Sequence, residues 1–225
     1  MGRAMGLNRT EAGNRYPVYF FAVYFLLYAG NGIFGPFIPV YLSGIGFGEK
    51  AIGSLMAIGP FVAMAAQPLW GYVGDRRKYK NTVLQGLILA TALVMLAFPL
   101  FHSYIYVFAV MAFFTFFQTA IYPLNDAITL ESIEPRGWKF GPIRMAGTLG
   151  YAVMAVMAGL LVKDNTSRMF PVYFILFLIT FGVVFMLPRV KGHQWKVNCN
   201  ASFPFVNQES RFENEFPNLH AKVPI

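Results

Sequence analysis

The chain has 225 residues and a net charge of +8, and 56% of its residues are hydrophobic, 17% aromatic and only 12% charged. A soluble globular domain carries about 25% charged residues, so this composition excludes an ordinary soluble protein and indicates a membrane protein. The single cysteine, Cys199, excludes an intramolecular disulfide and any cysteine metal cluster, and we expect neither a metal nor a cofactor.

Six apolar runs follow one another along the chain, and each approaches the length of about 20 residues that crosses a bilayer. The runs cover residues 16–42, 51–73, 82–101, 104–130, 145–162 and 169–187. Because the backbone must satisfy its own hydrogen bonds in lipid, we expect each run to be a helix. The predicted fold class is therefore an all-α membrane protein with six transmembrane helices in one bundle.

The predicted bundle occupies residues 16–190, between an N-terminal segment of residues 1–15 and a polar tail of residues 191–225 that we expect to be disordered. One set of connections holds thirteen lysines and arginines, whereas the alternate connections hold only Lys50, Lys163 and Arg168. Since basic residues mark the cytoplasmic side, both termini are predicted to be cytoplasmic, in a multi-pass protein of the cell membrane. The basic residues therefore indicate topology, and we expect no nucleic-acid partner.

Polar residues and prolines interrupt the first and fourth runs. Tyr24, Tyr28 and Asn31 stand at helical spacing in the first run, ahead of two prolines. The fourth run contains Gln118, Pro123, Asn125 and Asp126. The first and fourth runs are corresponding members of two three-helix units. Interruptions at corresponding positions of two such units point to a binding site near the bilayer midplane. The two tyrosines suit either cavity lining or ordinary packing, whereas Asn31 should face protein rather than lipid.

The segment from Asp126 to Tyr151 places an acid near the end of the fourth run and an arginine at the opening of the fifth. Charges this close to hydrocarbon are costly, so they tend to pair or to line a cavity. If the chain is helical from Arg144, then Arg144, Thr148 and Tyr151 share one face, being four and seven positions apart. Together with Asp126 they can hold a small polar molecule. The alternative is that both charges only mark the membrane boundary.

Residues 140–152 read Phe-Gly-x-x-Arg-Met-x-Gly-x-x-Gly-aromatic-Ala, which resembles the fifth helix of lactose permease and its relatives. These are the oligosaccharide, nucleoside and phenylpropionate proton symporters of the major facilitator superfamily. In that family an acid on the fourth helix precedes the arginine by eighteen positions, an interval that Asp126 and Arg144 keep. The resemblance implies that Asp126 is an acidic substrate ligand and Arg144 its partner. It also implies that Tyr151 stands where the permease stacks a tryptophan on the sugar.

The resemblance further implies the function, which is secondary active transport of a sugar, a nucleoside or an aromatic acid by proton symport. It implies half of a major facilitator fold, because the family has twelve helices in two bundles and the match covers only the first bundle. In lactose permease the proton-coupling residues lie largely in the second bundle. We therefore expect a truncated gene product, a chain that pairs with a separate second half, or a chain that dimerises with itself.

The connection after the second run resembles another signature of the superfamily. Residues 71–80 read Gly-Tyr-Val-Gly-Asp-Arg-Arg-Lys-Tyr-Lys, and Gly71, Asp75, Arg76 and the terminal basic Lys80 match, whereas the later glycine of the signature is missing. In the family this loop latches the two halves of the transporter in one state. The alternative is a basic topology anchor, which any membrane protein would show.

Other functional classes leave few traces in this sequence. An enzyme would need clustered histidines, cysteines or paired acids within the runs, and neither a nucleotide-binding glycine loop nor a nucleophile elbow appears. We therefore predict that the chain is not an enzyme, and that its partners are the bilayer, a small solute and protons. A membrane scaffold without transport is the main alternative.

Overall fold

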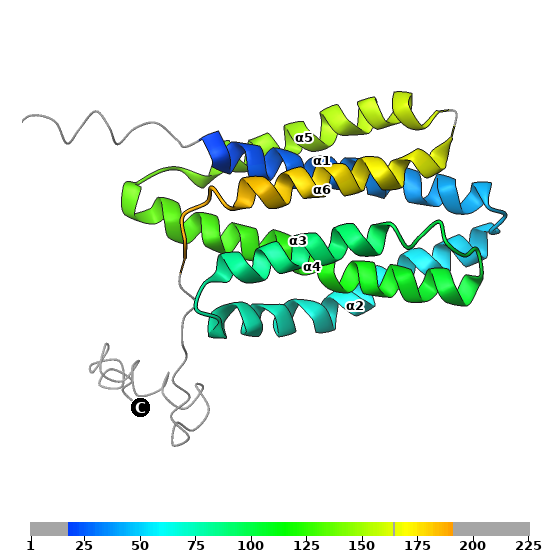
Figure 1. Cartoon of the computed structure of the whole chain (residues 1–225), viewed down its shortest axis with the longest axis horizontal. Coiled ribbons are helices and arrows are strands. Elements are labelled where there is room, and N and C mark those ends of the chain that lie inside the picture. Colours follow the sequence, from blue (N-terminus) through cyan, green and yellow to red (C-terminus); the bar gives the residue numbers. More distant parts are fainter. Residues whose placement is uncertain (1–17, 164, 191–225) are drawn as a thin grey trace, which may run out of the picture. The chain divides into compact units, whose positions relative to one another are not determined.

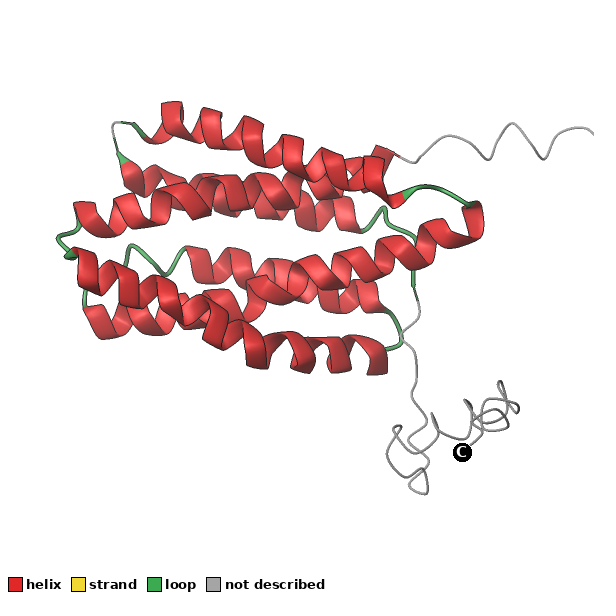
Figure 2. Ribbon diagram, turned by 180° about the vertical axis from the view of Figure 1, so that it is seen from behind, coloured by secondary structure: helices red, strands yellow, loops and turns green. Residues whose placement is uncertain are grey.

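The computed structural model describes residues 18–163 and 165–190, which form six α-helices and two short 3-10 helices (Figure 1). The α-helices are α1 Val18–Gly44, α2 Glu49–Arg76, α3 Lys80–Met95, α4 Tyr104–Ile133, α5 Phe140–Val162 and α6 Met169–Val184, and the 3-10 helices are η1 Glu134–Arg136 and η2 Thr166–Arg168. The described part of the chain contains no strand (Figure 2), so the predicted all-α fold is confirmed. The predicted N-terminal segment and polar tail lie outside the described residues.

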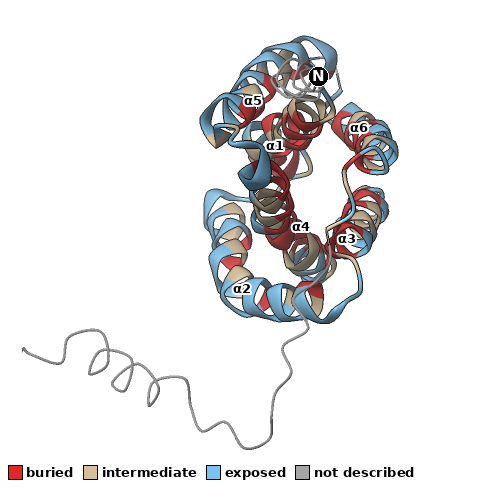
Figure 3. Cartoon of the chain, turned by 90° about the vertical axis from the view of Figure 1, so that its left-hand side faces the viewer, coloured by how far each residue is buried: buried red, intermediate tan, exposed pale blue. Residues whose placement is uncertain are grey.

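The helices pack in two groups that are joined along one side. Helix α1 packs against α5 and α6, α4 packs against α2 and α3, and α3 packs against α6. In the end-on view of Figure 3, α1 and α4 are central, α3 and α6 lie on one side, and α5 and α2 lie apart from each other on the other. Buried residues face inward from each helix, whereas the outer faces of α2 and α5 are largely exposed.

Five helical spans of the described chain are long and apolar enough to cross a membrane, where η2 and α6 count together as Thr166–Val184 with 19 residues. The 16-residue α3 is apolar but shorter. The predicted third run was therefore too long at its C-terminal end, because α3 stops at Met95 and residues 96–100 form turns. The cause is Pro99, which lacks a backbone N–H and disfavours helical geometry in the residue before it. Apolar character continues through these residues although the helix does not.

The predicted start of the fifth run was also wrong, since α5 begins at Phe140 rather than beside Arg144. Gly141 and Pro142 follow directly and do not break the helix. A proline is tolerated in the first turn, where the backbone N–H groups have no intrahelical acceptor. Arg144 consequently lies more than one turn inside the helix.

Close contact between α1 and α5 depends on glycine. A Cβ atom on Gly150 would lie 2.2 Å from the carbonyl oxygen of Phe25, and one on Gly32 would lie 2.6 Å from the carbonyl oxygen of Tyr151. Small residues let helix backbones approach in membranes, where van der Waals packing drives association. This contact fixes the position of Arg144 relative to the tyrosines of α1.

Candidate substrate site

The carboxylate of Asp126 on α4 connects α1 and α5. The hydroxyl of Tyr24 on α1 donates a hydrogen bond to Asp126 Oδ1 at 2.5 Å, and Arg144 Nη1 on α5 donates to Asp126 Oδ2 at 3.4 Å. Each carboxylate oxygen therefore has its own partner on a different helix. The structure brings the acid and the arginine together as an ion pair, as the sequence predicts for charges at this depth.

The two partners of Asp126 differ in exposure. Tyr24 is completely buried, whereas the Arg144 side chain is 56% exposed. A separation of 3.4 Å is long for an N–H···O hydrogen bond, which is usually 2.7–3.2 Å, so the ion pair is loose. A guanidinium has five N–H donors, so a half-exposed Arg144 has more donors than its contacts with Asp126 and the neighbouring Tyr28 can use.

Aromatic rings surround this ion pair. The Tyr28 ring stacks beside Tyr24 with centroids 6.3 Å apart and meets the edge of Tyr122 at 5.2 Å. Phe140 meets Tyr24 edge-on at 5.9 Å, and the guanidinium carbon of Arg144 lies 5.9 Å from the Phe140 centroid. Rings of this kind offer flat apolar faces and, in the tyrosines, hydroxyl groups. The site can therefore accommodate a flat polar solute.

The remaining predicted ligands lie farther from the carboxylate. Thr148 and Tyr151 are exposed on α5, and Asn31 is partly buried on α1. Since α5 is helical over this stretch, Arg144, Thr148 and Tyr151 do lie along one side of it, and all three are exposed. Among the described residues, however, no hydrogen bond or ion pair joins Asn31, Thr148 or Tyr151 to Asp126.

Helix α4 also carries a stripe of buried polar groups, two of which, Gln118 and Asn125, were predicted only as polar interruptions of the fourth run and not as ligands. Four side chains at positions i, i+4, i+7 and i+11 each have a buried polar atom without a hydrogen-bond partner in the described chain, and we call them the α4 polar stripe: Gln118, Tyr122, Asn125 and Thr129. Unpaired buried polar groups are expensive, so the stripe points to function.

Spacing along the helices would have found two of the missed residues. Tyr122 precedes Asp126 by four positions, and Phe140 precedes Arg144 by four, so each lies one turn from a predicted ligand. Phe140 was not predicted as a site residue because the fifth run was expected to begin at residue 145, whereas α5 begins at Phe140. Tyr122, like Tyr28, is a tyrosine within an apolar run, so the sequence pattern indicates both residues equally.

The predicted latch residues lie at the end of the bundle where α2 ends and α3 begins. Asp75 lies 3.4 Å from the ammonium of Lys80, and Lys80 also forms an ion pair with Glu131 of α4. Lys80 is 4% exposed, so this buried cation ties three helices together. Arg76 and Gly71 are exposed on α2, and the Arg76 guanidinium lies 4.3 Å from the centroid of a neighbouring tyrosine ring.

The chain is similar to several known transporters. The model described as "MFS_1 like family" matches residues 19–221. A maltose permease of Geobacillus stearothermophilus is 35% identical over 160 residues, which are 70% of this chain and 39% of that protein. A raffinose permease of Escherichia coli is 30% identical over 159 residues, 67% of this chain and 37% of that protein. The "probable 3-phenylpropionic acid transporter" of Escherichia coli (strain K12) is 29% identical over 164 residues, which are 73% of this chain and 42% of that protein.

Solved structures agree on the fold. Two crystal structures of the nucleoside transporter NupG match this chain at 17% sequence identity. The first has a TM-score of 0.76 and covers 88% of this chain, and the second has a TM-score of 0.73 and covers 90%. Each match covers 51% of the NupG chain. The chain thus spans about half, or less, of the length of the proteins that it matches. Since the family model covers most of the chain and the relatives are permeases rather than enzymes, the chain belongs to the MFS_1-like family of the major facilitator superfamily, as a multi-pass membrane protein with half of that fold.

Proposed function

We propose that this chain is one half of a secondary transporter that moves a sugar, a nucleoside or an aromatic acid across the cell membrane by proton symport. The loose ion pair of Asp126 with Arg144, at the junction of three helices, is the observation that carries this proposal. It is supported by relatives named for maltose, raffinose and 3-phenylpropionic acid, and by a fold shared with a nucleoside transporter.

In the proposed site, Arg144 turns from Asp126 to the solute and supplies two parallel N–H donors, which a lysine cannot do. Asp126 Oδ2 then accepts hydrogen bonds from hydroxyl groups of a sugar or ribose. Tyr28 and Tyr151 offer ring faces for stacking, and Asn31 and Thr148 complete the polar contacts. The buried Tyr24 takes part by holding Asp126 through its hydroxyl. The α4 polar stripe extends these contacts along α4.

Coupling to protons is proposed to depend on the second six-helix bundle, because the proton-coupling residues of lactose permease lie largely in its second bundle. Within the described residues, Asp126 is paired with Arg144, and Glu131, the other acid of α4, is paired with the buried Lys80.

A second six-helix bundle is proposed to cover the faces of α2 and α5, as a separate chain or as another copy of this one. Both faces expose large apolar side chains, which include Phe61, Met64, Met145, Leu149 and Leu160. Gly71, Asp75 and Arg76 lie at the end of α2 and would form the latch against that second bundle. Both termini are proposed to be cytoplasmic.

The test is uptake by proteoliposomes that contain the full chain, with labelled maltose, uridine and 3-phenylpropionate and an inward proton gradient. We expect the gradient to drive accumulation of one solute class, and both Asp126→Asn and Arg144→Lys to lower it at least tenfold. Arg168→Lys is the matched control, because Arg168 lies at the opposite end of the helices and should leave uptake unchanged.

Binding measured by calorimetry on the same samples separates the alternatives. Saturable binding that Arg144→Lys weakens, without uptake, would keep the site but show that this chain does not transport by itself. Near-normal binding in both charge variants would remove Asp126 and Arg144 from the site. A chain that neither binds nor transports any of the solutes would leave a scaffold function.

A further inference from the structure

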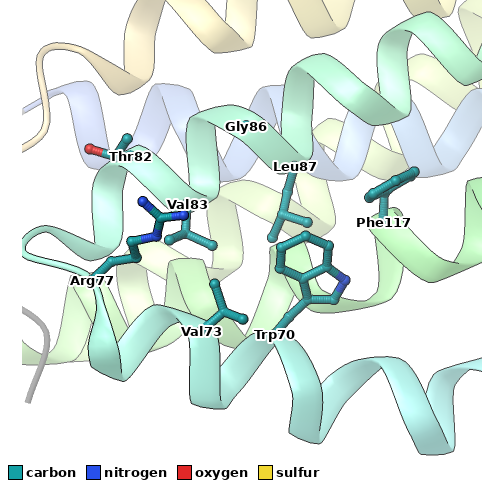
Figure 4. Close-up of a pocket in the computed structure, with 8 residues that line it drawn as sticks. All are labelled: Trp70, Val73, Arg77, Thr82, Val83, Gly86, Leu87 and Phe117. Carbon is teal, nitrogen blue, oxygen red and sulfur yellow. The ribbon is translucent and has the colours of Figure 1, made fainter.

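A cavity of about 320 Å³ lies between α2, α3 and α4, away from the candidate substrate site (Figure 4). Its walls are mostly apolar and include Trp70 and Val73 of α2, Leu87 of α3 and Phe117 of α4. The polar lining residues, Arg77 and Thr82, lie together toward one end, while Trp70 and Phe117 lie toward the other. This distribution matches an amphiphile, with a polar head at one end and an apolar tail along the walls.

The apolar part of the cavity is held open by its own contacts. Trp70 Nε1 donates a hydrogen bond to the carbonyl oxygen of Phe116 at 3.1 Å, and its ring lies 5.9 Å from that of Phe117. Gly86 on α3 lines the cavity, and a Cβ added there would meet no atom within 4 Å. The indole is therefore fixed in place, and the missing side chain at Gly86 leaves space that no neighbour fills.

Arg77 at the polar end is a cation that pairs with no acid of the described chain. It is exposed, and no ion pair or side-chain hydrogen bond of Arg77 occurs within residues 18–163 and 165–190. The carboxylates that lie nearby along α2 and α4, Asp75 and Glu131, are both engaged by Lys80. The Thr82 hydroxyl also has no hydrogen bond in that part of the chain. An arginine and a hydroxyl can bind a phosphate together.

We infer that this cavity is a binding site for an anionic phospholipid of the surrounding membrane, with its phosphate against Arg77 and Thr82 and an acyl chain against Trp70 and Phe117. Arg77 and Trp70 are seven residues apart, so the cavity follows α2 for about 10 Å, the length of the first several methylenes. Arg77 also lies between Arg76 and Lys78, and such a basic cluster favours a lipid of net negative charge over a zwitterionic one.

Trp70 can report the occupant directly. In the full chain, Trp138→Phe and Trp195→Phe leave Trp70 as the single tryptophan. The protein is placed in phosphatidylcholine vesicles that contain increasing fractions of brominated phosphatidylglycerol or, separately, brominated phosphatidylcholine. We expect half-maximal quenching of Trp70 at a mole fraction about fivefold lower for phosphatidylglycerol, the effect of one cation near an anionic lipid.

Variants separate this site from general attraction to an anionic surface. Arg77→Gln should abolish the preference for phosphatidylglycerol, whereas Lys78→Gln removes the same charge from an adjacent residue that does not line the cavity and should keep it. Gly86→Leu should fill the cavity and lower quenching by both lipids, and Gly86→Ala should do so in part. Circular dichroism checks that each variant remains folded.

Three results would overturn the inference. Equal quenching by the two lipids in the parent chain would show that the cavity has no preference for an anionic head. Equal losses in Arg77→Gln and Lys78→Gln would assign the preference to surface charge. Loss of the preference in excess inorganic phosphate would show that a free anion, and not a lipid, occupies the polar end.

Discussion

Tyr24 and Tyr122 both neighbour the ring of Tyr28, but their hydroxyls differ in their hydrogen bonds. Tyr24 donates to Asp126, whereas the buried Tyr122 hydroxyl has no partner among the described side chains and backbone groups. A hydrogen bond to a charged group contributes about 1.5–3 kcal/mol, while an unpaired buried polar group is destabilising. Similar residues in one site therefore have opposite effects on stability.

We predict that Tyr24→Phe lowers the free energy of unfolding by about 1.5–3 kcal/mol, because Asp126 loses its partner on α1. Tyr122→Phe should leave the melting temperature unchanged or raise it, since only an unpaired hydroxyl is removed. Thermal unfolding of both variants in the same detergent measures the difference. Equal shifts in the two variants would mean that the hydrogen bond to Asp126 does not stabilise the fold.

At the scale of helices, the contact between α1 and α5 is the one that sets the geometry of the candidate site. Gly147 accommodates the ring of Tyr28, since a Cβ there would lie 2.7 Å from the ring, and Gly150 meets the backbone of Phe25. A ring can move aside, but a helix backbone cannot move without moving the whole helix. Gly150 is therefore the stricter requirement of the two.

We predict that Gly150→Ala destabilises the bundle by about 1–3 kcal/mol, as overpacking does, and also weakens solute binding because α5 shifts away from α1. Gly159→Ala on the same helix is the control, since its added Cβ would meet only Phe37 at 3.8 Å and should be tolerated. Melting temperature and calorimetric binding give the two readouts. A Gly150→Ala variant as stable as Gly159→Ala would contradict the close approach of the two helices.

The helices illustrate what sequence reasoning can supply. The six apolar runs predict the six described α-helices because backbone polar groups in lipid leave no other structure. The positions of Asp126 and Arg144 predict the ion pair that links α4 to α5, although these two helices pack mainly against other helices. The predicted helix ends were less accurate than the predicted number of helices. The apolar third run continues past Pro99, for example, whereas α3 ends at Met95. Arg144 lies inside α5 rather than at its start because Pro142 is tolerated in the first turn of the helix. Composition alone does not reveal this.

Side-chain partners were harder to predict than helices. The hydrogen bond from Tyr24 to Asp126 joins residues that are 102 positions apart, and the partnership of Lys80 with Glu131 spans 51 positions. Such pairs depend on how the helices rotate about their axes, and that rotation follows from packing such as the glycine contacts of α1 with α5. Periodicity indicates which residues share a face, but not which helix that face meets.

At the scale of the whole described bundle, one end is cross-linked and rich in cations. Lys80 pairs with Asp75 and Glu131, and its backbone N–H donates to the carbonyl oxygen of Val190. The side chain of Asn81 donates to the carbonyl oxygen of Pro188 and accepts from the backbone N–H of Val190. These bonds join the ends of α2 and α4, the beginning of α3 and the segment after α6. The connection between α5 and α6, which contains Lys163 and Arg168, lies at the other end.

That charge asymmetry predicts the membrane orientation of this bundle, because lysines and arginines concentrate in cytoplasmic connections. We predict that the end containing Lys78 is cytoplasmic and that Asn165 faces outward. In a Cys199→Ser background, Asn165→Cys in intact cells should react with a membrane-impermeant maleimide. Lys78→Cys should react only after the membrane is permeabilised. Both positions are exposed, so a difference in labelling reports the side of the membrane rather than burial. The opposite pattern would reverse the topology and place the latch residues outside, and labelling of both positions in intact cells would exclude six spanning helices.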